Sequence, residues 1–167
     1  MRLDDLEPVI DAELRKIKAP GCSVAVVDAE GVIDARGFGF SDLRSGRRAD
    51  PSTIYHLFSI TKLLTATRVM QLVESGDLGL EMPISDCVPG APREVTLEHL
   101  LSHTSGLRDQ TKAFLAFHVE PRRRPTTSEA LSRFSLKAHE NPGGKASYQN
   151  VNYMLLGAVI EAVSRQP

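Results

Sequence analysis

The segment between residues 22 and 40 places the tightest limit on the fold. Its sequence, CSVAVVDAEGVIDARGFGF, has two strand-like runs on either side of the turn-forming residues 28–31, and therefore predicts a β-hairpin. A hairpin buries little apolar surface by itself and needs further strands or a layer of helices. Only helical patterns follow this one. We therefore expect a single α+β domain over residues 1–167 that is incomplete, with the remaining strands of its sheet following Pro167.

Helical spacing of apolar residues dominates the rest of the chain. Residues 41–53 are polar and rich in turn formers, so a loop is expected there. Gly76 is expected to end one helix, and Thr96 to cap another. The predicted helices cover residues 6–17, 59 or 60 to 75, 95–101, a segment after Thr127, and 151–164.

The charge balance argues against nucleic acid as a partner. The chain has 20 basic and 21 acidic residues and a net charge of -1, so no overall field attracts a polyanion. The one charge run, Arg122–Arg124, lies between two prolines and is expected to form a solvated loop. Nucleic-acid binding through this run is the alternative, and it would show salt-sensitive affinity.

The sequence carries no pattern for export, a membrane span, a cofactor or a metal. Its first residues, MRLDDLEPVIDAEL, are acidic, unlike a signal peptide, and no apolar run approaches the roughly 18 residues of a span. We expect a cytoplasmic protein as given, and a periplasmic or secreted one if a leader was removed. Cys22 and Cys87 lack metal or disulfide spacing and are expected to be reduced, part-buried thiols. His56 and His99 have no partners in a metal-binding pattern.

Ser59 and Lys62 suggest chemistry at the start of one predicted helix. A lysine in a first turn faces the positive end of the helix dipole, typically at a cost of about 0.3–1 kcal/mol. Residues three apart share a helix face, so the lysine amine can reach the serine hydroxyl, and a neutral amine there can activate it as a nucleophile. Leu63 and Leu64 are expected to give this amine an apolar setting. The alternative is a surface lysine beside a serine that acts as N-cap.

Tyr148 and Asn150 form a second candidate pair. They follow a glycine-rich loop, PGGKASYQN, at the start of the last predicted helix. A phenol can pass a proton to a leaving group, and a carboxamide can hold a lysine amine and bind a substrate carbonyl. The alternative is that Asn150 is only the N-cap of that helix.

Four stretches together resemble the serine beta-lactamase-related family. They are FSITK, ESGDLGLEMPISDCVP, VTLEHLLSHTSGL, and the PGGKASYQN loop that leads into VNYMLLGAVIEAVS. This family includes class C beta-lactamases, D-alanyl-D-alanine carboxypeptidases, D-aminopeptidases and family VIII-type esterases, and penicillin-recognising enzymes share its S-x-x-K motif. The resemblance implies a beta-lactamase/transpeptidase-like fold and an acyl-enzyme mechanism.

The resemblance also implies a role for each candidate residue. Ser59 would be the acylated nucleophile and Lys62 its base or proton shuttle. Tyr148 would handle the leaving-group proton, and Asn150 would orient Lys62 and the substrate. His103, in LSHTSGL, is expected to support the loop rather than the chemistry.

One part of the family pattern does not occur in the sequence. The Lys-Thr-Gly or His-x-Gly triplet, on a strand that lines the family's site, is absent from these residues. We expect a serine hydrolase for an ester or amide, with a small-molecule or peptide substrate: a beta-lactam, a D-amino peptide or a simple ester. The alternative is a non-catalytic remnant of the same fold used for binding or dimerisation. The unpaired edge of the hairpin would favour pairing with a second copy.

Overall fold

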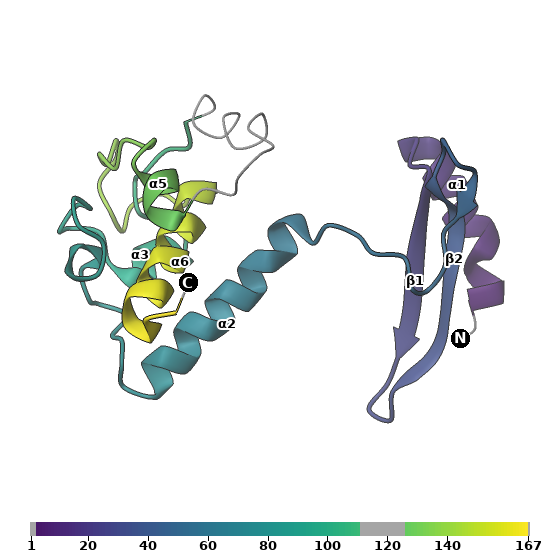
Figure 1. The fold of residues 1–167 in the computed structure, drawn as a ribbon, viewed down its shortest axis with the longest axis horizontal. Coiled ribbons are helices and arrows are strands. Elements are labelled where there is room, and N and C mark those ends of the chain that lie inside the picture. The colour runs from purple at the N-terminus through teal and green to yellow at the C-terminus, as the bar shows by residue number, and fades with distance from the viewer. Residues whose placement is uncertain (1–2, 111–125, 167) are drawn as a thin grey trace. The chain divides into compact units, whose positions relative to one another are not determined.

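The structure is a computed structural model that describes residues 3–110 and 126–166 (Figure 1). The chain forms two compact units, Met1–His56 and Leu57–Pro167, and each is described by itself below. The single domain expected over residues 1–167 stays a prediction. The arginine run at 122–124 lies outside the described residues.

The first unit contains the predicted hairpin. A 3-10 turn, η1 (Leu3–Leu6), leads into α1 (Glu7–Ile17), and the strands β1 (Gly21–Val27) and β2 (Val32–Asp42) then pair antiparallel (Figure 1). The turn between them forms because Asp28 Oδ1 accepts hydrogen bonds from the backbone N–H groups of Glu30 and Gly31, at 3.0 Å each. The hairpin and the N-terminal helix are therefore confirmed.

A third strand corrects one sequence-based expectation. The short strand β3 (Arg47–Arg48) pairs antiparallel with the end of β2, inside the segment predicted as loop, and the sheet order is β1-β2-β3. The sequence did not predict this strand, because two polar residues are too few to show the alternating pattern of a strand. Among the described residues β1 pairs with β2 alone, so the free edge expected from the sequence lies on β1.

The second unit is helical. It contains the 3-10 turns η2 (Phe58–Ile60) and η3 (Ile84–Asp86) and the helices α2 (Thr61–Glu74), α3 (Leu97–Leu101), α5 (Thr127–Leu131) and α6 (Asn150–Ser164) (Figure 1). The predicted helices are all present, with shifts of one or two residues at their ends. Thr96 caps α3 as expected. The C-cap of α2 is Ser75, and Gly76, at φ 81°, is the residue after it.

The core of the second unit holds α2 and α6 together. Val69 and Leu72 of α2 and Leu155 and Leu156 of α6 belong to one buried cluster, to which α3 adds further apolar side chains. In Figure 1 α6 runs beside α2. This packing matters for the site because α2 and α6 begin at its functional residues.

Gly106 lets two loops of the second unit approach closely. Its φ is 72°, and a Cβ built on it would lie 2.1 Å from the backbone oxygen of Glu140. We expect Gly106→Ala to lower the free energy of unfolding by more than the roughly 1–2 kcal/mol of a left-handed alanine, since the backbone contact adds to it. Gly79→Ala is the control, because Gly79 has open space and no left-handed φ. Urea unfolding of both variants checks this, and equal stabilities would contradict it.

Candidate active site

The four side chains predicted from the sequence lie together in the second unit. Ser59 Oγ is 2.7 Å from Tyr148 Oη and accepts a hydrogen bond from Lys62 Nζ at 3.4 Å. Lys62 Nζ also donates to Asn150 Oδ1 at 2.8 Å. A hydroxyl, an amine, a phenol and a carboxamide therefore form one connected hydrogen-bond network.

Two local structures bring these groups together. Ser59 lies in η2 and Lys62 in the first turn of α2, so the spacing of three residues puts both on one face. The loop before α6 delivers the other two. Its backbone is held by a hydrogen bond from Ser147 N to His103 O at 2.8 Å, which places Tyr148 one residue further on. Asn150 is the first residue of α6.

Neither simple capping alternative describes these residues. The N-cap of α2 is Ile60, and the N-cap of α6 is Gln149, so neither Ser59 nor Asn150 occupies a cap position. Neither N-cap residue makes a side-chain cap hydrogen bond. Both polar side chains are instead directed to Lys62 and its neighbours.

The backbone at Ser59 also differs from an ordinary helix start. Phe58, the residue before it, has a φ of 45°, in the left-handed region that non-glycine residues rarely adopt. Such strained positions are concentrated at functional sites. Ser59 follows in η2, and its own backbone N–H lies at a helix start, where such groups lack a helical acceptor and can bind an oxyanion.

The expected apolar setting of Lys62 is wrong. Leu63 and Leu64 are 68% and 62% exposed, because residues one and two positions further along a helix do not share its face. The amine is surrounded instead by oxygen atoms and aromatic rings. It lies 4.9 Å from the ring centroid of Tyr148 and 5.7 Å from that of Tyr153, distances at which a cation is attracted to an aromatic face.

Tyr148 is electrostatically tuned by these neighbours. The pKa of its phenol is lowered from its usual value, first by the Lys62 amine beside it and second by the hydrogen bond to Ser59. Positive charge and hydrogen-bond donors both favour a phenolate. Tyr148 is 57% exposed, so this residue is accessible to a reacting molecule. The shortest contact of the Ser59 hydroxyl is thus with a phenol whose phenolate form, the form that can accept a proton, is favoured by its neighbours.

Two further polar residues, Asp109 and His103, adjoin the network. The sequence did not point to Asp109, and it indicated no contact partners for His103. Asp109 accepts hydrogen bonds from the backbone N–H groups of Asn150 and Val151 at 2.9 and 2.8 Å, and from Asn150 Nδ2 at 2.8 Å. His103 stacks on Tyr148 with 4.6 Å between ring centroids. A carboxylate in a loop gives no local signal of a helix that starts 41 residues later.

His103 is held as a neutral imidazole. Its Nδ1 accepts from Gln149 N–H at 3.2 Å and faces Asn152 Nδ2 at 3.1 Å, and the Asn152 Oδ1 is taken by the Ser105 hydroxyl at 2.6 Å. A proton on Nδ1 would therefore meet two donors. Burial lowers the pKa of His103, the Lys62 charge lowers it further, and Asp109 opposes both.

This arrangement predicts a stability loss in mild acid. Because the folded pKa is depressed below the usual 6.5, the stabilising contribution is complete above pH 6.5 and is lost as pH falls through the folded value. The His103 ring is faced by Lys62, Asp109, Tyr148 and Tyr153. These four residues must therefore stay unchanged in the protein used for this test.

Urea unfolding between pH 7.5 and 5 checks the expectation. His103→Asn should flatten the slope below pH 6.5, since asparagine tolerates the φ of 60° at this position. His139→Asn, at an exposed histidine, should leave the slope unchanged. Identical slopes for the wild type and His103→Asn would contradict the neutral assignment.

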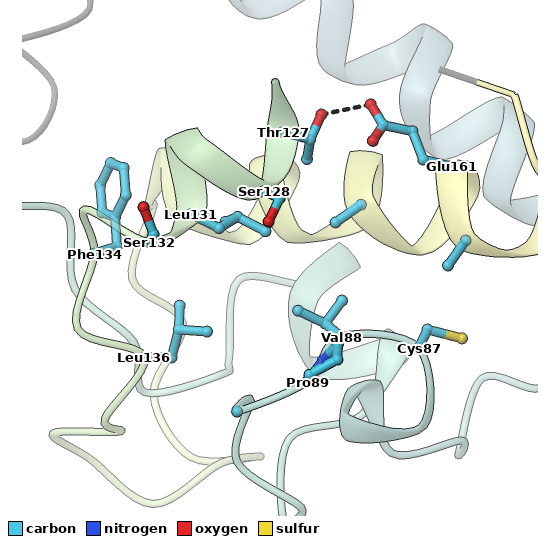
Figure 2. Close-up of a pocket in the computed structure, with 13 residues that line it drawn as sticks. Cys87, Val88, Pro89, Thr127, Ser128, Leu131, Ser132, Phe134, Leu136 and Glu161 are labelled. Atoms are coloured by element: carbon cyan, nitrogen blue, oxygen red, sulfur yellow. Dashed lines mark hydrogen bonds between the residues drawn. The ribbon is translucent and has the colours of Figure 1, made fainter. Parts of the chain in front are cut away.

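A separate cavity of about 640 Å³ lies between α5, the C-terminal half of α6 and the loop after η3 (Figure 2). Val88, Leu131 and Phe134 supply apolar walls, and Thr127 donates a hydrogen bond to Glu161 at its upper edge in Figure 2. The Cys87 thiol on its rim is free, and burial, followed by Asp86, raises its pKa, which disfavours the reactive thiolate. None of the four network residues lines this cavity.

The comparison with protein families assigns the chain. The family model described as Beta-lactamase matches residues 6–167. The chain belongs to the beta-lactamase family. The family and the α+β fold class expected from the sequence are therefore confirmed.

Individual relatives agree with this assignment. "Protein flp" of Staphylococcus aureus (strain N315) is 30% identical over 168 residues, which cover 96% of this chain and 33% of the relative. The octameric penicillin-binding protein homologue from Pyrococcus abyssi has a TM-score of 0.84 and 34% identity over 99% of this chain and 40% of its own. A penicillin binding protein from Bacillus halodurans has a TM-score of 0.75 and 28% identity; the match covers 94% of this chain and 49% of that protein's chain. The chain thus spans about a third of the length of the curated relative it matches.

Two features are absent from the described residues, a membrane-spanning helix and a metal-binding cluster. No helix among residues 3–110 and 126–166 is both long and apolar enough to cross a membrane. The same residues contain no group of three or more histidine, cysteine or acidic side chains placed to hold a metal ion.

Proposed function

We propose that the chain is an acyl-transfer serine hydrolase that cleaves an ester or amide through an acyl-enzyme on Ser59. The observation that carries this proposal is the 2.7 Å contact between Ser59 Oγ and Tyr148 Oη, beside the Lys62 amine. A serine hydroxyl needs an adjacent base to become a nucleophile, and the phenolate of Tyr148, which its neighbours favour by lowering the pKa, can be that base.

The geometry supports a division of roles. Ser59 Oγ attacks the substrate carbonyl carbon while its proton passes to the Tyr148 phenolate. The resulting oxyanion is stabilised by the backbone N–H of Ser59 at the helix start. The bond from the carbonyl carbon to the leaving oxygen or nitrogen then breaks, and Tyr148 donates the proton to that leaving atom. Water repeats the sequence on the acyl-enzyme and releases the acid.

Lys62 and Asn150 support the proton transfer. Lys62 Nζ lies 3.4 Å from Ser59 Oγ, further than the phenol, so we assign the lysine to holding charge near Tyr148 rather than to the first proton transfer. Asn150 Oδ1 fixes the amine at 2.8 Å. The substrate class is proposed only as far as a beta-lactam, a D-amino peptide or a simple ester, since several members of this set share the same acyl chemistry.

A non-catalytic binding role is the second candidate. It is favoured by the separate cavity beside α5 and α6, which none of the four network residues lines. Such a protein would fold stably and would not be acylated.

Stopped-flow hydrolysis of p-nitrophenyl acetate separates the two candidates. The proposal predicts a burst of p-nitrophenol followed by slower turnover, because acylation precedes deacylation. Ser59→Ala should abolish the burst, whereas Ser132→Ala, at an exposed serine after α5, should retain it. A burst that survives in Ser59→Ala, or its absence from the wild type, would refute the catalytic proposal in favour of the binding one.

A further inference from the structure

We propose that Asp109 is a positioning residue that fixes the Asn150 carboxamide and, through it, the Lys62 amine; this inference rests on the proposed function. Asp109 Oδ2 accepts from Asn150 Nδ2 at 2.8 Å and from Asn150 N at 2.9 Å. Asp109 Oδ1 accepts from Val151 N at 2.8 Å. One carboxylate therefore holds both the backbone and the side chain of Asn150.

The chemistry of the two neighbours leaves Asn150 a single orientation. A carboxylate only accepts hydrogen bonds, and a lysine ammonium only donates them. The carboxamide between them must turn its NH₂ to Asp109 and its oxygen to Lys62. If the amide were reversed, Lys62 Nζ would face two donors and Asp109 would face an acceptor. Asp109 thus determines that an acceptor atom, Asn150 Oδ1, lies 2.8 Å from the amine.

Asp109 also replaces the missing cap of α6. Gln149 occupies the N-cap position without a side-chain cap hydrogen bond, and the carboxylate of Asp109 takes two backbone N–H groups of the first turn instead. A negative charge is favourable at this end of a helix. The Asp109 backbone is held in turn, because its N–H donates to Gln149 Oε1 at 2.6 Å. The helix start and the carboxamide therefore share one anchor.

A capping role and a positioning role predict different results for one substitution. Asp109→Asn keeps the size of the side chain but adds an NH₂ donor that competes for the acceptor positions. If Asp109 positions Lys62 through Asn150, the rate constant for acylation of Ser59 should fall by about 10- to 100-fold, the scale of a misplaced catalytic group. In the Asn150→Ala background the same substitution should change that rate constant by less than about threefold, because the route through the carboxamide is already lost.

Thr126→Ala provides the matched control for capping. Thr126 caps α5 in the same unit with its side chain, so its loss weakens a helix start without touching the network. Unfolding in urea measures how much each variant destabilises the protein. Thr126→Ala should acylate at the wild-type rate despite its lower stability.

The experiment combines acylation kinetics with NMR of the Asn150 side-chain NH₂, assigned by its absence from Asn150→Ala. The NH₂ resonances should shift in Asp109→Asn and stay in place in Thr126→Ala. Unchanged NH₂ resonances in Asp109→Asn, or an equal loss of rate in both Asn150 backgrounds, would overturn the inference. The resonances report on the anchor even if the wild type is not acylated, so failure of the proposed function is distinguished from failure of this inference.

Discussion

Replacement of Lys62 by methionine should slow acylation of Ser59 by about 10²–10⁴-fold, the usual contribution of assisted proton transfer. Methionine keeps the length of the side chain but cannot donate to Ser59 Oγ or Asn150 Oδ1. It also removes the main cause of the lowered Tyr148 pKa. Rates of phosphonylation by a fluorophosphonate, measured by intact mass, give the comparison.

The pH dependence of the same variant tests the role of Tyr148. If the phenolate is the base, acylation rises with pH through the Tyr148 pKa, and loss of the neighbouring positive charge raises that pKa. The residual activity of Lys62→Met should therefore begin at higher pH than in the wild type. Lys137→Met, at an exposed lysine of the same unit, is the control and should match the wild type. A Lys62→Met rate within threefold of the wild type would contradict the assigned role.

Leu156→Ala should lower the free energy of unfolding by about 2–5 kcal/mol, the range for a leucine removed from a packed core. Leu156 is fully buried in α6 and belongs to the cluster that also holds Val69 and Leu72 of α2. The substitution removes apolar contacts and leaves a cavity between the elements that carry the network. Urea unfolding, monitored by circular dichroism, measures the change in the free energy of unfolding.

The exposed face of α2 supplies the control for this substitution. Leu63→Ala removes the same atoms from a side chain that is 68% exposed in this unit, and should change stability by no more than about 0.5 kcal/mol. Equal losses for Leu63→Ala and Leu156→Ala would show that the cluster is not the core of this unit.

Local patterns in the sequence predicted the α-helices of the described residues and the pairing of Ser59 with Lys62. Apolar spacing predicted α2 and α6 because each buries one face on a common core. The i,i+3 relation of Ser59 and Lys62 predicted that they meet, since it depends only on helix geometry. Tyr148 and Asn150 were connected to them by the family resemblance, which orders segments that no local rule relates.

Long-range polar contacts were beyond the reach of such patterns. Asp109 caps a helix that begins 41 residues later, and the partners of His103 Nδ1 lie 46 and 49 residues away. The periodicity of apolar residues does not predict such contacts, because only the folded chain brings these loops together. The apolar setting expected for Lys62 was wrong because the helix geometry turns Leu63 and Leu64 outward. Strand β3 was missed because its pairing depends on the end of β2.

The most direct test of the central claim is the site of covalent modification. The protein is incubated with a fluorophosphonate and with a fluorescent penicillin, digested, and mapped by tandem mass spectrometry. The account predicts one adduct, on Ser59, whose formation fails in Ser59→Ala and persists in Ser132→Ala. An adduct confined to another residue, or an unmodified Ser59 after prolonged incubation with both reagents, would contradict it.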